Sequence, residues 1–111
     1  MDTGIKILIV DDQPSILTLL KRILNQAGFN DIFEAGNGKS AWGLLESQQI
    51  DLIIADWIMP EMNGLELLKK IRSSAAHKHI PFMMLTGEAN KEQIIEAVKT
   101  GASNYVVKPF T

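Results

Sequence analysis

The sequence predicts an α/β fold: a doubly wound sheet of five parallel strands with helices on both faces. Short apolar runs, of the kind found in strands buried on both faces, alternate with segments whose apolar residues recur at helical spacing. Strands and helices that alternate in this way build a parallel sheet through right-handed crossovers. A length of 111 residues suits one domain with a modest core.

The first strand is expected at residues 6–10, an apolar run that reads KILIV. Pro14 suits the first turn of the helix that follows, because proline lacks an N–H that this turn would leave unbonded. The apolar residues of that helix lie at helical spacing: Ile16, Leu19, Leu20, Ile23, Leu24 and Ala27. Gly28 ends the helix, and residues 32–35 form a short second strand.

The middle of the chain contains the stretch around which the fold is organised. Residues 50–60 read IDLIIADWIMP, which we interpret as a central strand whose apolar run ends in one carboxylate, Asp56. A helix at residues 40–46 precedes this strand, after a turn at Asn37 and Gly38. A third helix follows it, with Leu65, Leu68 and Ile71 on its buried side and an i,i+4 pair of Glu66 and Lys70 on its wet side.

The last third repeats the pattern of strand, helix and strand. Residues 80–86 form the fourth strand. Asn90 and Gln93 have the spacing of a capping box, which starts a helix that runs to about Thr100 and ends at Gly101. Residues 104–108 form the fifth strand.

Polar side chains stand where four of these strands end. Asp11 and Asp12 follow the first strand, Asp56 ends the third, Thr86 the fourth and Lys108 the fifth. A helix cap or a solvated loop would explain any one of them, but the carboxyl ends of parallel strands share one edge, where α/β proteins bind ligands. The set therefore predicts a functional site at that edge.

The residue types at this edge indicate the chemistry. Three adjacent carboxylates repel one another unless a cation joins them, and ligands that are all oxygen favour a hard ion such as Mg²⁺. Asp56 can act as a carboxylate nucleophile toward phosphorus. Lys108 can then neutralise the phosphoryl oxygens, and Thr86 can hydrogen-bond to one of them. We interpret the site as one for phosphoryl transfer onto the protein itself.

Four motifs carry a resemblance that covers nearly the whole chain. They are VDD at residues 10–12, DWIMPEMNG at 56–64, LTGEA at 85–89 and GASNYVVKPF at 101–110. In order and spacing they resemble the receiver domain of two-component response regulators, and most closely its chemotaxis members. The resemblance implies a flavodoxin-like sheet with strand order 2-1-3-4-5, and a receiver domain over residues 1–111 that stops after the fifth strand, without the family's fifth helix.

The family resemblance also implies roles for individual residues. Asp56 would be the phosphoacceptor, supplied by a histidine kinase, a phosphotransfer domain or a small phosphodonor. Mg²⁺ would be held by Asp11 or Asp12, by Asp56 and by the backbone carbonyl of Ile58. Thr86 and Tyr105 would be the switch pair, Lys108 would bind the phosphate, and the Lys108–Pro109 bond would be cis. A downstream protein would bind the face of the fourth helix and fifth strand, at Ile94, Val98 and Tyr105; for the first two, a place in the core is an equal alternative.

The chain departs from the family pattern in two places. Ile58 stands where relatives have a polar asparagine. Together with Glu88 it flanks the path of the water that would hydrolyse the acyl phosphate, so we expect both residues to tune dephosphorylation. Without a fifth helix, the first helix would stand alone on its face of the sheet. We therefore expect bare apolar residues on the central strands and on the inner side of that helix, and a dimer through this face.

Two other functional classes use a similar sheet. A Mg²⁺-dependent phosphatase of the haloacid dehalogenase type needs a second aspartate two residues after the nucleophile, where this chain has Ile58. A nucleotide- or flavin-binding module needs a glycine-rich first loop, whereas Asp11 and Asp12 place negative charge there. The pair His77 and His79 lacks a third metal ligand nearby, and we interpret it as solvated surface.

Composition excludes several partners. A net charge of -2 provides no footprint for nucleic acid or an anionic membrane. The sequence shows no membrane-spanning run and no signal peptide, and the lack of cysteine fits a reducing compartment. We therefore expect a cytoplasmic protein.

Overall fold

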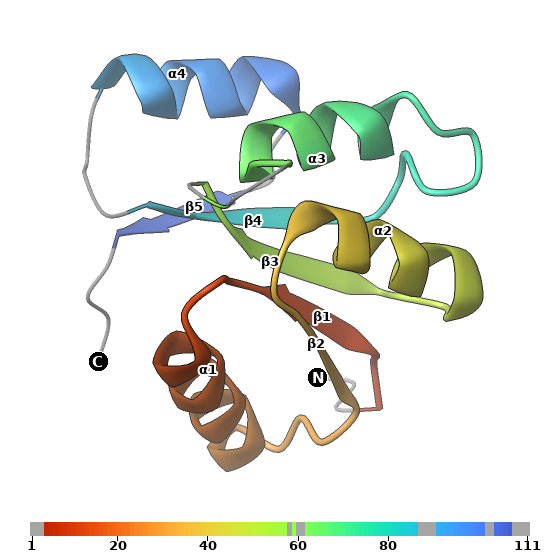
Figure 1. Cartoon of the computed structure of the whole chain (residues 1–111), viewed down its shortest axis with the longest axis vertical. Helices are drawn as coiled ribbons and strands as arrows, with labels where there is room; N and C mark the ends of the chain where they lie inside the picture. The colour runs from red at the N-terminus through yellow and green to blue at the C-terminus, as the bar shows by residue number, and fades with distance from the viewer. Residues whose placement is uncertain (1–3, 58, 60–61, 87–90, 102–103, 108–111) are drawn as a thin grey trace.

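The computed structural model describes residues 4–57, 59, 62–86, 91–101 and 104–107. It contains a five-stranded parallel sheet in the order β2-β1-β3-β4-β5, which confirms the predicted fold and strand order (Figure 1). The strands are β1 (Ile7–Val10), β2 (Ile32–Ala35), β3 (Leu52–Asp56), β4 (Phe82–Thr86) and β5 (Asn104–Val107). The helices are α1 (Pro14–Gln26), α2 (Gly38–Ser47), α3 (Gly64–Arg72) and α4 (Lys91–Thr100).

The largest differences from the predicted element boundaries are two residues each, at the starts of α2 and β4. Asn37 caps α2 and accepts a hydrogen bond from the Ser40 N–H at 2.8 Å, so the expected turn at Asn37 and Gly38 is the start of the helix. The fourth strand starts at Phe82 instead of residue 80. The Ile80 N–H donates to the His77 carbonyl in the preceding turn, and Pro81 has no N–H for the sheet.

The start of α3 also bears on the predicted Glu66–Lys70 pair. Asn63 and Glu66 form a reciprocal capping box: the Glu66 N–H donates to the Asn63 side chain at 2.8 Å, and the Asn63 N–H donates to Glu66 Oε1 at 3.1 Å. The ammonium of Lys70 lies 4.5 Å from the centre of the Trp42 ring on α2. The expected Glu66–Lys70 pair is therefore wrong, because each side chain has another partner.

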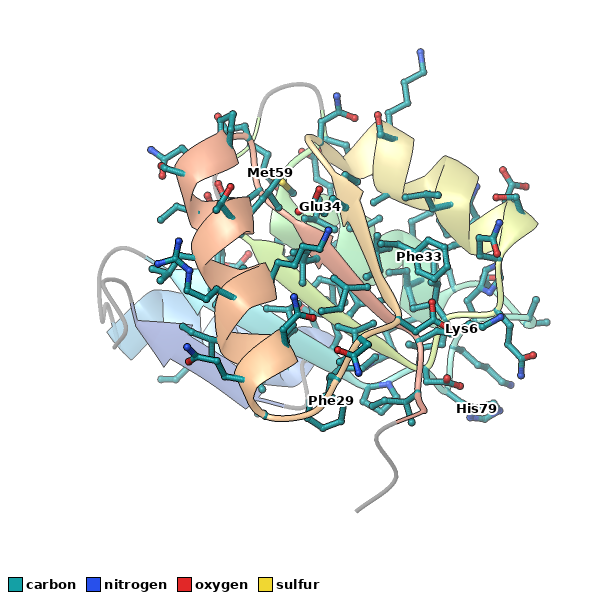
Figure 2. All side chains as sticks on the ribbon, turned by 90° about the horizontal axis from the view of Figure 1, so that it is seen from below. Lys6, Phe29, Phe33, Glu34, Met59 and His79 are labelled. Carbon is teal, nitrogen blue, oxygen red and sulfur yellow. The ribbon has the colours of Figure 1, made fainter. Side chains whose placement is uncertain are left out.

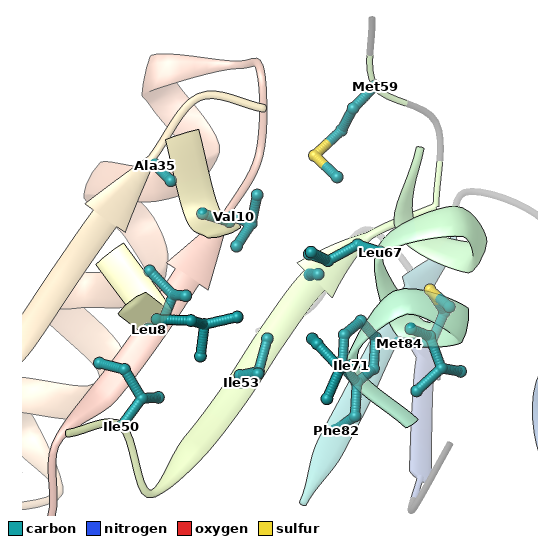
Figure 3. Close-up of a cluster of buried hydrophobic side chains, with 14 residues drawn as sticks. Leu8, Val10, Ala35, Ile50, Ile53, Met59, Leu67, Ile71, Phe82 and Met84 are labelled. Carbon is teal, nitrogen blue, oxygen red and sulfur yellow. The ribbon is translucent and has the colours of Figure 1, made fainter. Parts of the chain in front are cut away.

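The larger core lies between the sheet and α2 and α3. Alternate strand residues point to this side, among them Leu8, Ile53 and Phe82, and meet Leu67 and Ile71 of α3 (Figure 3). All five side chains are fully buried. This face of the sheet carries α2, α3 and α4, and α1 lies on the other face, as predicted (Figure 1).

The α1 face of the sheet is better covered than the sequence suggested. Ile54 and Leu85 of the central strands are only 5% and 1% exposed, so the expectation that they would be bare is wrong. Leu20 of α1 packs on them, and Phe29, beyond the end of this helix, widens the cover (Figure 2). The apolar surface that stays accessible on this face belongs to half-buried residues such as Leu24, which we call the rim of the face.

Candidate functional site

The sheet brings the predicted carboxylates together. β1 and β3 are parallel neighbours whose register pairs Val10 with Ala55, so the residues that follow, Asp11 and Asp56, come level with each other. One carboxylate oxygen from each of Asp11, Asp12 and Asp56 lies within 4.8 Å of the others. Residues 45 positions apart in the chain thus share one site, as the strand-end argument predicted.

The three aspartates differ in exposure. Asp11 is completely buried, Asp56 is 7% exposed, and Asp12 faces solvent. The Gln13 N–H donates to Asp11 Oδ1 at 2.9 Å, which orients that carboxylate at the start of α1. The site therefore combines two buried carboxylates with a third, that of Asp12, which water can reach.

Oxygen donors of this kind fit a hard divalent cation. Two closely spaced carboxylates with little access to water are unfavourable unless positive charge compensates them. Mg²⁺ prefers one or two carboxylates together with several waters, and the exposed Asp12 carboxylate is accessible to water. The donor set thus supports the expected Mg²⁺ site.

The start of α3 lies against the end of β3. The Gly64 N–H donates to the Trp57 carbonyl at 2.8 Å. A Cβ at Gly64 would collide with the backbone carbonyl of Asp56 and lie 3.0 Å from Met84 Sδ. Gly64 therefore lets α3 begin directly against the backbone of Asp56. This close approach was not predicted from the sequence.

A second glycine supports the same turn from α2. A Cβ at Gly38 would lie 2.7 Å from the Met62 carbonyl oxygen and 2.8 Å from Met62 Cβ. The first turn of α2 therefore packs directly on the segment that leads into α3. The signal of this close packing in the sequence was a glycine at the first position of both α2 and α3. Neither glycine has a positive φ, so the backbone conformation does not explain why glycine stands there.

The backbone places two of the other predicted site residues. Thr86 ends β4, one residue beyond Leu85, which pairs with Asp56 across the sheet. Tyr105 lies in β5 opposite Met84 of β4. The side chains of Thr86 and Tyr105 lie outside the described part of the structure, so their predicted switch contact stays a prediction.

The remaining predicted site residues are Ile58, Glu88 and Lys108, and all three lie outside the described residues. On α4, Val98 is 56% exposed, which excludes the alternative that it belongs to the core. Ile95 is 43% exposed, and sequence reasoning had named its neighbour Ile94, whose side chain is not among those described. Ile95 and Val98 are three residues apart and share one helix face.

The histidines of the α3–β4 connection lie apart from the acidic site. The His77 ring meets the Trp42 ring edge-on, with 5.5 Å between their centres. His79 points into solvent (Figure 2). Among the described helices, none is both long and apolar enough to span a bilayer.

Comparison with known proteins agrees with this geometry. A family model of the response regulator receiver domain matches residues 7–111. Chemotaxis protein CheY1 of Helicobacter pylori is 45% identical over 107 residues, which are 96% of this chain and 86% of the relative. Chemotaxis protein CheY-3 of Vibrio cholerae is 44% identical over 111 residues, which are 100% of this chain and 85% of the relative.

A solved structure shares the architecture. The chemotaxis response regulator CheY4 of Vibrio cholerae matches with a TM-score of 0.90 and 35% identity, covering 97% of this chain and 89% of that one. The sheet order, the aspartate cluster and the family match lead to one conclusion: the chain belongs to the receiver domain family of response regulators, and within it to the CheY type.

Proposed function

We propose that this receiver domain is switched by phosphorylation of Asp56, with a histidine kinase or a phosphotransfer domain as the donor. The observation that carries the proposal is the approach of the Asp11, Asp12 and Asp56 carboxylates to within 4.8 Å of one another. The chain would then be a signalling protein whose only catalysis is its own phosphorylation and dephosphorylation. Acetyl phosphate with Mg²⁺ should add one phosphoryl group, which the intact protein mass measures.

Mg²⁺ is the proposed cofactor, held by Asp11 or Asp12, by Asp56 and by the Ile58 carbonyl. When bound, it supplies positive charge that neutralises the phosphoryl oxygens. An Asp56 carboxylate oxygen attacks phosphorus while the bond to the donor's imidazole nitrogen breaks, and the nitrogen keeps the electron pair. Lys108 pairs with a phosphoryl oxygen during this transfer.

The proposed switch starts at the end of β4. A phosphoryl group on Asp56 accepts a hydrogen bond from the Thr86 hydroxyl and draws that side chain inward, after which Tyr105 rotates into the space that Thr86 leaves. The partner surface then changes on α4 and β5, where we place Ile94, Ile95, Val98 and Tyr105. Exposed Ile95 and Val98 support this surface.

Chemotaxis is the pathway that the names of the relatives suggest, with a cytoplasmic location. We propose that residues 1–111 act as one receiver domain in such a pathway. The phosphatase and the nucleotide- or flavin-binding alternatives are not favoured, because the receiver family model covers residues 7–111.

The residue at position 58 should control how long the phosphoryl group survives. Hydrolysis needs a water molecule in line behind phosphorus. Ile58 cannot hydrogen-bond this water, and its branched side chain screens the acyl phosphate, whereas Glu88 stays polar. We expect slower loss of the phosphoryl group from the wild type than from Ile58→Asn. The decay of isolated phosphoprotein measures this rate, and equal rates would refute the role of Ile58.

Association of two chains through the α1 face stays a prediction. The half-buried rim residues Leu17, Leu24 and Met83 provide its apolar surface. Because Ile54 and Leu85 are buried, we expect a weak dimer that forms only at high protein concentration. Light scattering over a concentration series measures it, and a constant monomer mass up to millimolar concentration would contradict it.

A further inference from the structure

Arg72, the last residue of α3, joins three segments of the chain. Its Nε donates to the Gly101 carbonyl oxygen at 2.9 Å. Its Nη1 donates to the carbonyl oxygens of Ile80 at 2.7 Å and Lys78 at 3.2 Å. One side chain thus ties the end of α3 to the α3–β4 connection and to the residue that follows α4.

This contact needs a guanidinium. Burial lowers the pKa of Arg72 from its ordinary value, because a cation loses hydration there. The side chain nevertheless stays charged at neutral pH, since a guanidinium keeps its proton in proteins. The Gly101 carbonyl oxygen that it binds lies at the carboxyl end of α4, where the helix dipole favours positive charge. The planar fork of donors can reach several carbonyls at once, whereas a lysine ammonium is a single point.

The backbone of Gly101 fits this arrangement closely. Its φ of +115° is a left-handed conformation that favours glycine. A Cβ at this position would lie 2.9 Å from Arg72 Nε and 3.2 Å from Arg72 Cδ. The carboxyl end of α4 therefore approaches Arg72 as closely as a residue without a side chain allows.

The two ends of α3 connect this anchor with the acidic site. Gly64 starts α3 against the carbonyl of Asp56, and Arg72 ends the helix after nine residues. At its other end, α4 follows the connection from Thr86, which stands at the acidic edge of the sheet. The amino end of α4 thus leads from the site, and its carboxyl end is bound to α3.

We propose that Arg72 is a positioning residue that holds the carboxyl end of α4 on α3, so that α4 turns about Gly101 when the site is phosphorylated. This inference rests on the proposed function, because that function supplies the signal that moves α4. Displacement is then largest at the amino end of α4 and smallest at the anchored end. The exposed residues of the proposed partner surface lie between these ends, so a tilt of α4 changes their position relative to the sheet.

The anchor can be tested in the protein without phosphate. Amide hydrogen exchange in the last turn of α4, residues 98–101, should be roughly tenfold faster in Arg72→Met, which is the size expected for loss of one hydrogen bond to a charged group. Arg72→Lys keeps the charge without the fork and should fall between wild type and Arg72→Met. Lys69→Met, at an exposed position of the same helix end, is the matched control and should leave exchange in α4 unchanged.

The pivot is tested with Mg²⁺ and beryllofluoride, an anion that mimics the phosphoryl group. Trp57 fluorescence reports occupation of the site, and wild type, Lys69→Met and Arg72→Met should all respond at similar beryllofluoride concentrations. When beryllofluoride is added, the amide hydrogen exchange rates should change in the amino half of α4 in the wild type and along the whole helix in Arg72→Met.

The outcomes separate the inference from the proposed function. If Arg72→Met matched Lys69→Met in both states, the inference would be overturned while the proposed function stood. A uniform change along α4 in the wild type would also overturn it. Absence of any Trp57 response in the wild type would overturn the proposed function and the pivot with it. The exchange rates of Arg72→Met and Lys69→Met without phosphate would then test only whether Arg72 anchors α4.

Discussion

Replacing Asp56 with alanine should abolish labelling of the chain by acetyl phosphate and Mg²⁺. The substitution removes the carboxylate that ends the central strand β3, which is the nucleophile that we propose for the transfer. The variant should still fold, because the substitution removes one negative charge from a cluster of three carboxylates that repel one another. The intact mass, recorded over time beside circular dichroism of the same samples, measures both expectations.

The matched control is Asp31→Ala, since Asp31 is an exposed aspartate outside the site. It should be labelled like the wild type. Undiminished labelling of Asp56→Ala would refute Asp56 as the acceptor.

Replacing both Asp11 and Asp12 with alanine should keep the acceptor but slow the transfer on the order of 10²–10³-fold, the size seen when one group that stabilises transition-state charge is lost. Trp57 fluorescence in a Mg²⁺ titration should show that this variant no longer binds the metal.

Gly64→Ala should have the largest effect on stability among the glycine substitutions in the helices. The new Cβ would meet the carbonyl of Asp56, which belongs to the backbone of the central strand and cannot rotate away. Overpacking of this kind costs about 1–3 kcal/mol in the free energy of unfolding. Urea denaturation measures this loss. Because the collision displaces the Asp56 backbone, transfer from acetyl phosphate should slow as well.

Gly43→Ala is the control for the loss of a helical glycine. Gly43 is exposed in the middle of α2, and a Cβ there would meet nothing within 4 Å. This substitution should stabilise the protein by about 0.5–1 kcal/mol, because alanine loses less backbone entropy than glycine in a helix. If Gly64→Ala were as stable as Gly43→Ala, the close approach of α3 to Asp56 would not constrain the site.

Most of the fold could be predicted from local patterns in the sequence. Apolar runs such as residues 52–55 fit strands that are buried on both faces, and the structure buries residues 53–55 of this run and half-buries Leu52. The alternation with helical segments predicts parallel strands, whose carboxyl ends share one edge. That inference was enough to bring Asp11 and Asp56 together, although 45 residues separate them, because it depends on strand direction and on no detail of packing.

Local patterns failed where a side chain had a choice of partners. Glu66 and Lys70 have the spacing of a helical ion pair, yet Glu66 caps α3 and Lys70 lies over Trp42. Spacing shows which residues can meet on one helix, and it does not show the cap or the aromatic ring that compete for them. The prediction of a bare face beneath α1 was wrong for a similar reason. It considered only the helix on that face and left out Phe29, which packs against the same cluster from a loop.

The sequence by itself determined the element order, the direction of the strands and the chemical character of the acidic edge. These follow from periodicity and residue type, which are local properties of the chain. Only the tertiary structure decided that α3 starts against the Asp56 carbonyl at Gly64 and that Arg72 binds the residue after α4. Such contacts depend on how closely two backbone segments that are remote in the sequence approach each other. The packing of the whole core between them sets that distance.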